Sequence, residues 1–144
     1  MATCGDDRTV RMWDAVTYEM VHEVKEHDNQ ILSLRFSRDG SRFATAGRDG
    51  KAIVWDTKTC VPIVTMETDL MKARCARFSP DGTILATGGG DAHVKLWDIE
   101  TGDLRAIYKS HDNPIYSVGF TPDGKTLFSA GGGANSKIVL RRIP

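Results

Sequence analysis

The sequence predicts an all-β fold built from a repeated unit of four short antiparallel strands, and three observations support this prediction. The dipeptide Trp-Asp recurs at Trp13, Trp55 and Trp97, which are spaced 42 residues apart. A turn motif of the form Ser/Thr-X-Asp-Gly recurs at the same spacing. No stretch of about 11 residues shows the apolar period of an amphipathic helix. A fixed period in this range indicates units that stack on their neighbours.

Further columns of residues keep the same register along the chain, so the spacing of the Trp-Asp pairs is not a coincidence. The turn motifs are Ser37-Arg38-Asp39-Gly40, Ser79-Pro80-Asp81-Gly82 and Thr121-Pro122-Asp123-Gly124, and the other columns are Phe36, Phe78, Phe120 and Thr3, Thr45, Thr87, Ser129. Proline presets the first turn position, and glycine takes the left-handed conformation that closes a hairpin.

The third repeat shows the four expected strands most clearly. We expect strands at 73–78, 84–87, 94–97 and 104–108, and the glycines at 88–90 together with Asp91 are expected to form the turn between the second and third strands. Four short strands in about 40–45 residues is the spacing of a propeller blade.

Composition narrows the classes of function. Lys plus Arg and Asp plus Glu both number 19 in 144 residues, so the basic excess of a dedicated nucleic-acid binder is missing. Cys4, Cys60 and Cys75 are odd in number and share no Cys-X-X-Cys spacing, which argues against a disulfide framework and a zinc site and favours the cytoplasm or the nucleus. No apolar run approaches the ~20 residues of a membrane span, and no signal peptide is recognisable.

These repeated motifs resemble the WD-repeat family over essentially the whole chain. The resemblance implies β-propeller blades of four antiparallel strands in an incomplete ring, with blade units at roughly 1–26, 27–68, 69–110 and 111–144. In this family the repeat as written straddles two blades, because the last strand of one blade precedes the inner strands of the next.

The resemblance also implies a buried tetrad of hydrogen-bonded Trp, Ser/Thr, His and Asp side chains in each complete repeat. The second repeat supplies all four members, His27, Thr45, Asp49 and Trp55. The incomplete sets are Thr3, Asp7 and Trp13 in the first repeat, Thr87, Asp91 and Trp97 in the third with Asp69 in place of His, and His111, Ser129 and Asn135 in the fourth with Arg141-Arg142 in place of Trp-Asp. A complete chain of bonds satisfies every buried polar group, so we expect the third and fourth repeats to be looser.

Several residues invite a chemical interpretation, and for each we favour a structural one. His27 and Asp49 resemble a catalytic pair, but the tetrad occupies both. His27 and His111 lie on different blades, so no metal is expected. The glycine runs 88–90 and 131–133 are not followed by the Gly-Lys-Ser/Thr of a phosphate-binding loop. We therefore expect no cofactor and no enzymatic activity.

The remaining cysteines and histidines are expected to be structural or exposed. Cys75 aligns with Ser33 and Ser117 and is interpreted as a packed thiol. Cys60 aligns with a glycine in an outer turn and is expected to be exposed, as are His22 and His93.

The number of repeats is too small for a closed ring. At 42 residues a blade, the chain holds about 3.4 blades, whereas propellers have about 4–8. The first blade is expected to lack its inner strand and the last its outer strand, which leaves the apolar residues Val10, Met12, Val139 and Leu140 on open faces. A segment of a longer propeller is favoured over self-association and over coverage by another chain.

The function that the resemblance implies is a protein–protein interaction scaffold whose partners contact the loops at the top face. The candidate partner-binding residues are Asp6, Arg48 and Gly90 before the turn Asp, and Asn29, Gln30, Met71, Lys72, Asn113 and Pro114 at the start of the inner strands. They vary where the core columns do not. A component of a ribonucleoprotein or other large assembly is the alternative, without direct nucleic-acid binding, and an enzyme is the least favoured class.

Overall fold

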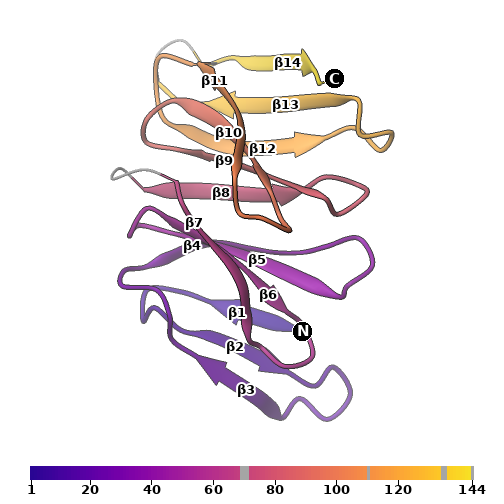
Figure 1. Cartoon of the computed structure of the whole chain (residues 1–144). Helices are drawn as coiled ribbons and strands as arrows, with labels where there is room; N and C mark the ends of the chain where they lie inside the picture. The colour runs from indigo at the N-terminus through magenta and orange to yellow at the C-terminus, as the bar shows by residue number, and fades with distance from the viewer. Residues whose placement is uncertain (69–71, 110, 134–135, 144) are drawn as a thin grey trace.

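The computed structural model describes residues 1–68, 72–109, 111–133 and 136–143 as a stack of four antiparallel sheets (Figure 1). The sheets are blade 1 with β1 (Ala2–Cys4), β2 (Val10–Trp13) and β3 (Met20–Val24); blade 2 with β4 (Ile31–Phe36), β5 (Arg42–Gly47), β6 (Lys51–Asp56) and β7 (Pro62–Glu67); blade 3 with β8 (Ala73–Phe78), β9 (Ile84–Gly89), β10 (His93–Asp98) and β11 (Leu104–Lys109); and blade 4 with β12 (Ile115–Phe120), β13 (Thr126–Gly131) and β14 (Ile138–Arg142). The predicted four-stranded antiparallel unit is confirmed, and blades 1 and 4 have three strands each. No described segment forms a helix that is long and apolar enough to cross a membrane.

The Ser/Thr-X-Asp-Gly motifs form the tight turns at one end of the blades. In blade 2 the Ser37 hydroxyl donates to Asp39 at 2.6 Å, and Asp39 accepts the Ser41 N–H at 3.1 Å. Gly40 has a φ of 73°, which an L side chain rarely adopts. The hydrogen bonds from Ser37 and then Ser41 lower the pKa of Asp39 to about 2. The same hydroxyl-to-carboxylate bond recurs from Ser79 to Asp81 and from Thr121 to Asp123.

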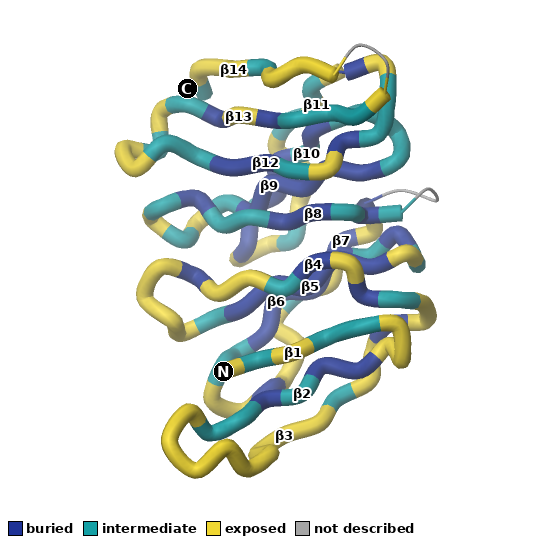
Figure 2. Tube along the Cα trace, turned by 180° about the vertical axis from the view of Figure 1, so that it is seen from behind, coloured by how far each residue is buried: buried dark blue, intermediate teal, exposed yellow. Residues whose placement is uncertain are grey.

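The core consists of three apolar layers, one between each pair of adjacent blades. Figure 2 shows buried residues along the strands of all four blades. Blades 1 and 2 bury Val10, Met12, Ile31, Phe43 and Trp55; blades 2 and 3 bury Ala44, Val54, Leu85 and Trp97; blades 3 and 4 bury Ala86, Leu96, Ile115 and Leu127. Trp55 and Trp97 therefore each pack on the blade before their own, and the alternating residues of their strands, Val54 and Leu96, pack on the blade after it.

The expectation that Val10 and Met12 lie on an open face is wrong. Their exposed fractions are 1% and 6%, because their side of β2 faces blade 2 and not the outside of the stack. At the other end of the stack Leu140 is 71% exposed, as expected, and Ile138 is 72% exposed beside it. Val139 was also expected on the open face, but it is half-buried, because successive residues of a strand point to opposite sides of the sheet.

The expected turn at residues 88–91 begins later than predicted. Gly88 and Gly89 belong to β9 and pair with β8 and β10. A Cβ on Gly88 would lie 2.7 Å from Ile115 Cγ2 of the next blade. Gly88 therefore allows close packing between blades, whereas a Cβ on Gly89 would clash with the Lys72 carbonyl of its own blade.

Candidate functional site

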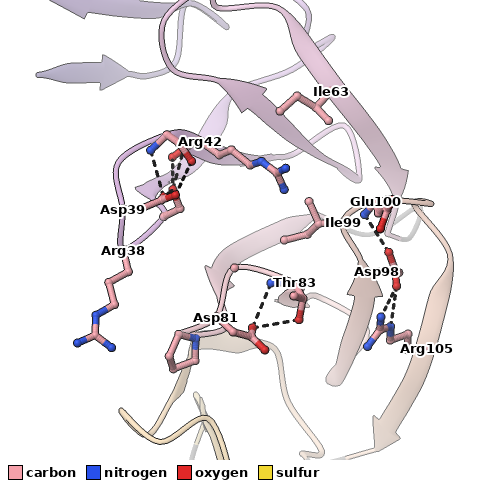
Figure 3. Close-up of a pocket in the computed structure, with 14 residues that line it drawn as sticks. Arg38, Asp39, Arg42, Ile63, Asp81, Thr83, Asp98, Ile99, Glu100 and Arg105 are labelled. Carbon is pink, nitrogen blue, oxygen red and sulfur yellow. Dashed lines mark hydrogen bonds and ion pairs between the residues drawn. The ribbon is translucent and has the colours of Figure 1, made fainter.

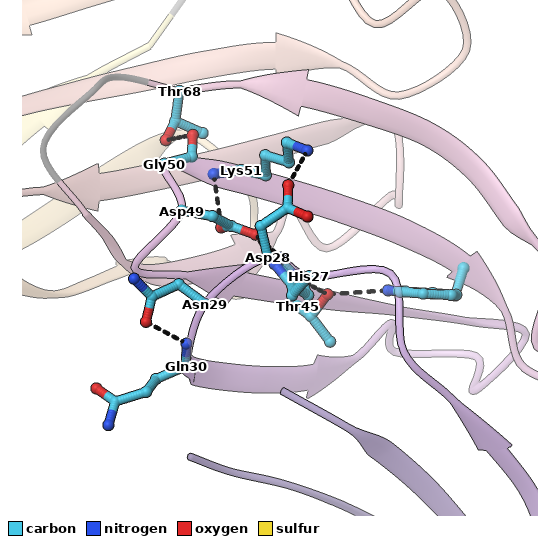
Figure 4. Close-up of polar contacts among 10 residues, drawn as sticks. His27, Asp28, Asn29, Gln30, Thr45, Asp49, Gly50, Lys51 and Thr68 are labelled. Carbon is cyan, nitrogen blue, oxygen red and sulfur yellow. Dashed lines mark hydrogen bonds and ion pairs between the residues drawn. The ribbon is translucent and has the colours of Figure 1, made fainter. Parts of the chain in front are cut away.

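The tetrad of blade 2 is a continuous chain of buried hydrogen bonds (Figure 4). The Trp55 indole N–H donates to Thr45 Oγ1 at 2.9 Å, and the Thr45 hydroxyl donates to His27 Nε2 at 2.7 Å. His27 Nδ1–H then donates to Asp49 Oδ2 at 2.8 Å. The side chains of His27 and Asp49 are 0% and 4% exposed. The chain fits a neutral imidazole that accepts at one nitrogen and donates at the other.

Asp49 also joins the tetrad to the backbone of two loops. Its carboxylate accepts the N–H of Asp28 at 2.9 Å and the N–H of Lys51 at 3.1 Å. Lys51 Nζ reaches back to the exposed carboxylate of Asp28 at 2.7 Å. Because each polar side-chain group of the tetrad has a hydrogen-bond partner, the tetrad holds the 25–30 and 48–50 loops in one relative position.

Blade 3 replaces the tetrad histidine contact with a lysine. Trp97 donates to Thr87 Oγ1 at 2.9 Å, as in blade 2. Asp91 forms an ion pair with Lys95 at 2.9 Å, and the side chain of Asp91 is 16% exposed and that of Lys95 14%. The ammonium of Lys95 also donates to the Thr68 carbonyl. Asp69, expected at the histidine position, lies outside the described residues.

The position of Lys95 follows a rule across the blades. The strand register places Arg11, Ile53, Lys95 and Val139 opposite Thr3, Thr45, Thr87 and Ser129. In blades 2 and 4, which contain His27 and His111, this position is aliphatic. In blades 1 and 3 it is basic and pairs with the turn aspartate, Arg11 with Asp7 at 2.6 Å and Lys95 with Asp91. In blade 3, where the sequence has Asp69 at the histidine position, Lys95 thus binds the aspartate that histidine binds in blade 2, which was not expected from the sequence.

Blades 1 and 4 hold the remaining parts of the predicted tetrads. Trp13 donates to Thr3 Oγ1 at 2.9 Å in an exposed position. In blade 4 His111 Nε2 lies 2.9 Å from Ser129 Oγ. Burial, and secondarily the positive charge of Lys137, lower the pKa of His111 below its usual value. Asn135, the expected substitute for Asp, lies outside the described residues.

Arg141 takes the tryptophan position of blade 4, as the sequence predicted. It pairs with Leu127 where Trp97 pairs with Leu85 in blade 3. Its guanidinium lies 4.4 Å from the centre of the Tyr108 ring on blade 3. A cation–π contact thus replaces the indole as the link to the preceding blade.

The predicted partner-binding loops gather at the end of the blades opposite the Asp-Gly turns, which we call the top face. In each of blades 2 to 4, the N–H of the second loop donates to the carbonyl at the start of the inner strand: Arg48 to Gln30 at 2.8 Å, Gly90 to Lys72 at 3.2 Å and Gly132 to Pro114 at 3.1 Å. These repeated bonds join the candidate residues into one fixed surface.

The exposure of the candidate residues varies along the top face. Asp6, Asn29 and Arg48 are exposed, whereas Gln30, Lys72, Gly90, Asn113 and Pro114 are half-buried. The Arg48 guanidinium donates to the Gln30 amide oxygen. Met71 lies outside the described residues.

A second group of top-face residues was not predicted from the sequence. Leu32, Arg74 and Tyr116 are the second residues of the inner strands β4, β8 and β12, and each sits at a β-bulge that shifts the register of its strand. The bulge turns the side chain out of the sheet, and Leu32 and Tyr116 are 39% and 56% exposed. The Arg74 guanidinium lies 4.7 Å from the centre of the Tyr116 ring. The three positions are 42 residues apart, which is the only signal in the sequence.

The cysteines and histidines outside the tetrads agree with the expectations only in part. Cys75 is buried as predicted, with its thiol directed at the Gly88 carbonyl, and burial raises its pKa to about 11. Cys60 was expected to be exposed and is 3% exposed, because its turn folds the side chain against the layer between blades 1 and 2. His22 is exposed, but His93 is half-buried beside Asp91. Among the described residues, no three His, Cys, Asp or Glu side chains are placed to hold a metal ion.

Stacked antiparallel blades of three or four strands, with Trp55 and Trp97 each packed on the blade before its own, define a repeat protein of the β-propeller class. The family model of the WD domain, G-beta repeat, matches residues 1–14, 18–56, 62–98 and 102–140, and the chain therefore belongs to this family. A search of curated proteins gave no match to this chain. WD repeats generally act as scaffolds for protein–protein interaction and are typically not enzymes.

Proposed function

We propose that this chain holds one or more protein partners on its top face, through the bulge residues of the inner strands and the loops beside them. The observation that carries the proposal is the row of Leu32, Arg74 and Tyr116, which three separate bulges direct out of the sheets. Tyrosine and arginine are among the side chains that contribute most binding energy at protein interfaces, and Leu32 adds exposed apolar surface on the neighbouring blade.

The fixed loops around this row support the same proposal. The bonds from Arg48, Gly90 and Gly132 to the inner strands hold the loop backbone in place, so little conformational freedom is lost when a partner binds.

We also propose that the protein resides in the cytoplasm or the nucleus. Cys4, Cys60 and Cys75 are free thiols, which supports a reducing compartment, the cytoplasm or the nucleus.

The experiment is affinity capture from nuclease-treated extract with quantitative mass spectrometry. Arg74→Glu and Tyr116→Ala should each remove the same captured proteins, because both side chains belong to one surface. Ile107→Ala is the matched control, since Ile107 is 51% exposed on the outer strand β11, close to the 56% of Tyr116. Unchanged capture by both top-face variants, or capture that nuclease abolishes, would contradict the proposal.

A further inference from the structure

The end of the blades opposite the top face carries a groove between blades 2 and 3 (Figure 3). It has a volume of about 880 Å³ and is bounded by the Asp-Gly turns of both blades and by the turn between β10 and β11. Ile63 of β7 and Ile99 line its apolar part, and Arg38 and Arg42 lie on the blade 2 side. Both blades have four strands, so the groove is independent of the open faces at the ends of the stack.

Three of the four carboxylates in the groove are already used by their own turns. Asp39 accepts bonds from Ser37 and Ser41, and Asp81 accepts bonds from Ser79 and Thr83. Asp98 binds the guanidinium of Arg105 and two turn N–H groups. These aspartates are therefore part of the fold and are poor acceptors for a ligand.

Arg38 and Arg42 are different, because their guanidinium groups have no ion-pair or hydrogen-bond partner within the described chain. Figure 3 shows the Arg42 side chain directed into the groove between Ile63 and Ile99, with Arg38 at the rim. Ile63 is 45% exposed, which leaves apolar surface beside the free charge. Glu100, on the far wall, is exposed and makes no side-chain bond in the described structure.

The two arginines are peculiar to this groove and are not a feature of the repeat. In blade 3 the same positions are Pro80 and Ile84, and in blade 4 they are Pro122 and Thr126. Arg38 is also the only departure from proline in the three turn motifs. The turns form equally well in all three blades, so turn geometry does not require either arginine.

From these contacts we infer that the groove binds an extended acidic segment of a partner protein, with an aliphatic side chain against Ile63 and a carboxylate on Arg42. The match is local to the blade 2 wall, because the full lining holds four carboxylates and three arginines. On that wall the two unpaired guanidinium groups lie beside the apolar side chain of Ile63, and this combination suits a peptide in which acidic and aliphatic residues alternate. Arg38 at the rim would bind a second carboxylate. This site goes beyond the proposed top-face function and lies at the opposite end of the blades.

The test uses the full chain and fluorescence anisotropy with a labelled peptide, Gly-Glu-Ile-Asp-Glu-Ile-Asp-Gly. Saturable binding is expected, and it should weaken as NaCl rises because ion pairs at a surface are screened. The variant Arg38→Pro/Arg42→Ile copies the residues of blade 3, so the turn and strand are compatible with it. It should weaken binding about tenfold or more, the loss expected from removing charge-assisted bonds.

Matched controls separate this site from general attraction of acids. Lys58→Glu changes the charge of an exposed lysine in a neighbouring turn of blade 2 outside the groove, and it should leave the affinity within about twofold. Ile63→Ser should weaken binding, and a peptide with Ser in place of Ile should bind more weakly than the parent peptide. Arg74→Glu on the top face should have no effect, so this proposal and the proposed function can fail separately.

Three results would overturn the inference. One is the absence of saturable binding by the acidic peptide up to about 1 mM. Another is equal loss in Lys58→Glu and in the double arginine variant. The third is tighter, arginine-dependent binding of a labelled single-stranded 12-nucleotide RNA, which would assign the groove to nucleic acid.

Discussion

Thr45 and Thr87 are equivalent residues in consecutive blades, yet removing their hydroxyl groups should have different costs. Thr45 accepts from Trp55 and donates to His27, whereas Thr87 has one bond of the tetrad type, from Trp97. Replacing each by valine keeps the size and branching of the side chain and removes only the hydroxyl. The difference between the two variants therefore measures how much the hydrogen bond between Thr45 and His27, which we call the histidine arm of the tetrad, contributes to stability.

The magnitude follows from the number of buried groups that lose their partner. A buried donor or acceptor without a partner costs about 1–3 kcal/mol. Thr45→Val leaves both the Trp55 indole N–H and His27 Nε2 unpaired, for about 2–6 kcal/mol in total. Thr87→Val leaves only the Trp97 indole N–H, for about 1–3 kcal/mol.

The assay is urea unfolding of the two variants and the wild-type chain, followed by circular dichroism. Thr65→Val, on the exposed side of β7 and without a side-chain bond in the described structure, is the control and should stay within about 0.5 kcal/mol of wild type. Equal losses at Thr45 and Thr87, or a larger loss at Thr87, would refute the reasoning that the histidine arm stabilises blade 2.

Four further outcomes follow from the same structure. Trp55→Ala should lower the free energy of unfolding by about 1–3 kcal/mol more than Trp97→Ala, because both variants create a cavity but only Trp55 belongs to a complete tetrad. Urea unfolding of the two variants measures this difference, and equal losses would contradict the prediction. Lys95→Ile should destabilise by about 1–2 kcal/mol, since a nearly buried carboxylate loses its ion pair, and no loss would mean that the lysine does not compensate for histidine. The lowered pKa of His111 means that the fold prefers its neutral form, so its contribution to stability is complete above about pH 6.5 and is lost as the pH falls through the folded-state pKa. The melting temperature of the wild-type chain should therefore fall with pH in this range, and it should fall less in His111→Gln. The same pH dependence in His111→Gln would show that another group causes it. The isolated chain should form dimers or larger assemblies at micromolar concentration, because β14 has an exposed apolar face that includes Leu140 and a free strand edge. A single monomeric mass near 15.8 kDa by light scattering would contradict this prediction.

The repeated pattern was sufficient to predict the strands, and the resemblance to the WD-repeat family implied the tetrad residues. A spacing of 42 residues places Thr3, Thr45 and Thr87 in one column and the tryptophans in another, and the hydrogen bonds between the two columns exist in all three blades. These features depend on local strand and turn geometry, which the repeated residues encode directly.

Other features depend on contacts that a single column does not reveal. The bulge that exposes Tyr116 arises from strand register, and nothing in the local residues distinguishes it from a regular strand. Cys60 is buried because its left-handed turn, with φ of 55°, folds it against the core. The pairing of Lys95 with Asp91 becomes visible only when the strand register of all blades is compared. Which side of β2 faces a neighbour was misassigned for the same reason.

Site-specific photo-crosslinking tests the proposed top-face scaffold most directly. A photoreactive residue is placed at position 32 or 116 on the top face, or at position 107 on the outer strand as a control of similar exposure. In nuclease-treated extract, positions 32 and 116 should crosslink to the same protein or proteins, and position 107 should not. Equal yields at the three positions, or crosslinks confined to position 107, would contradict a scaffold that binds its partners through the top face.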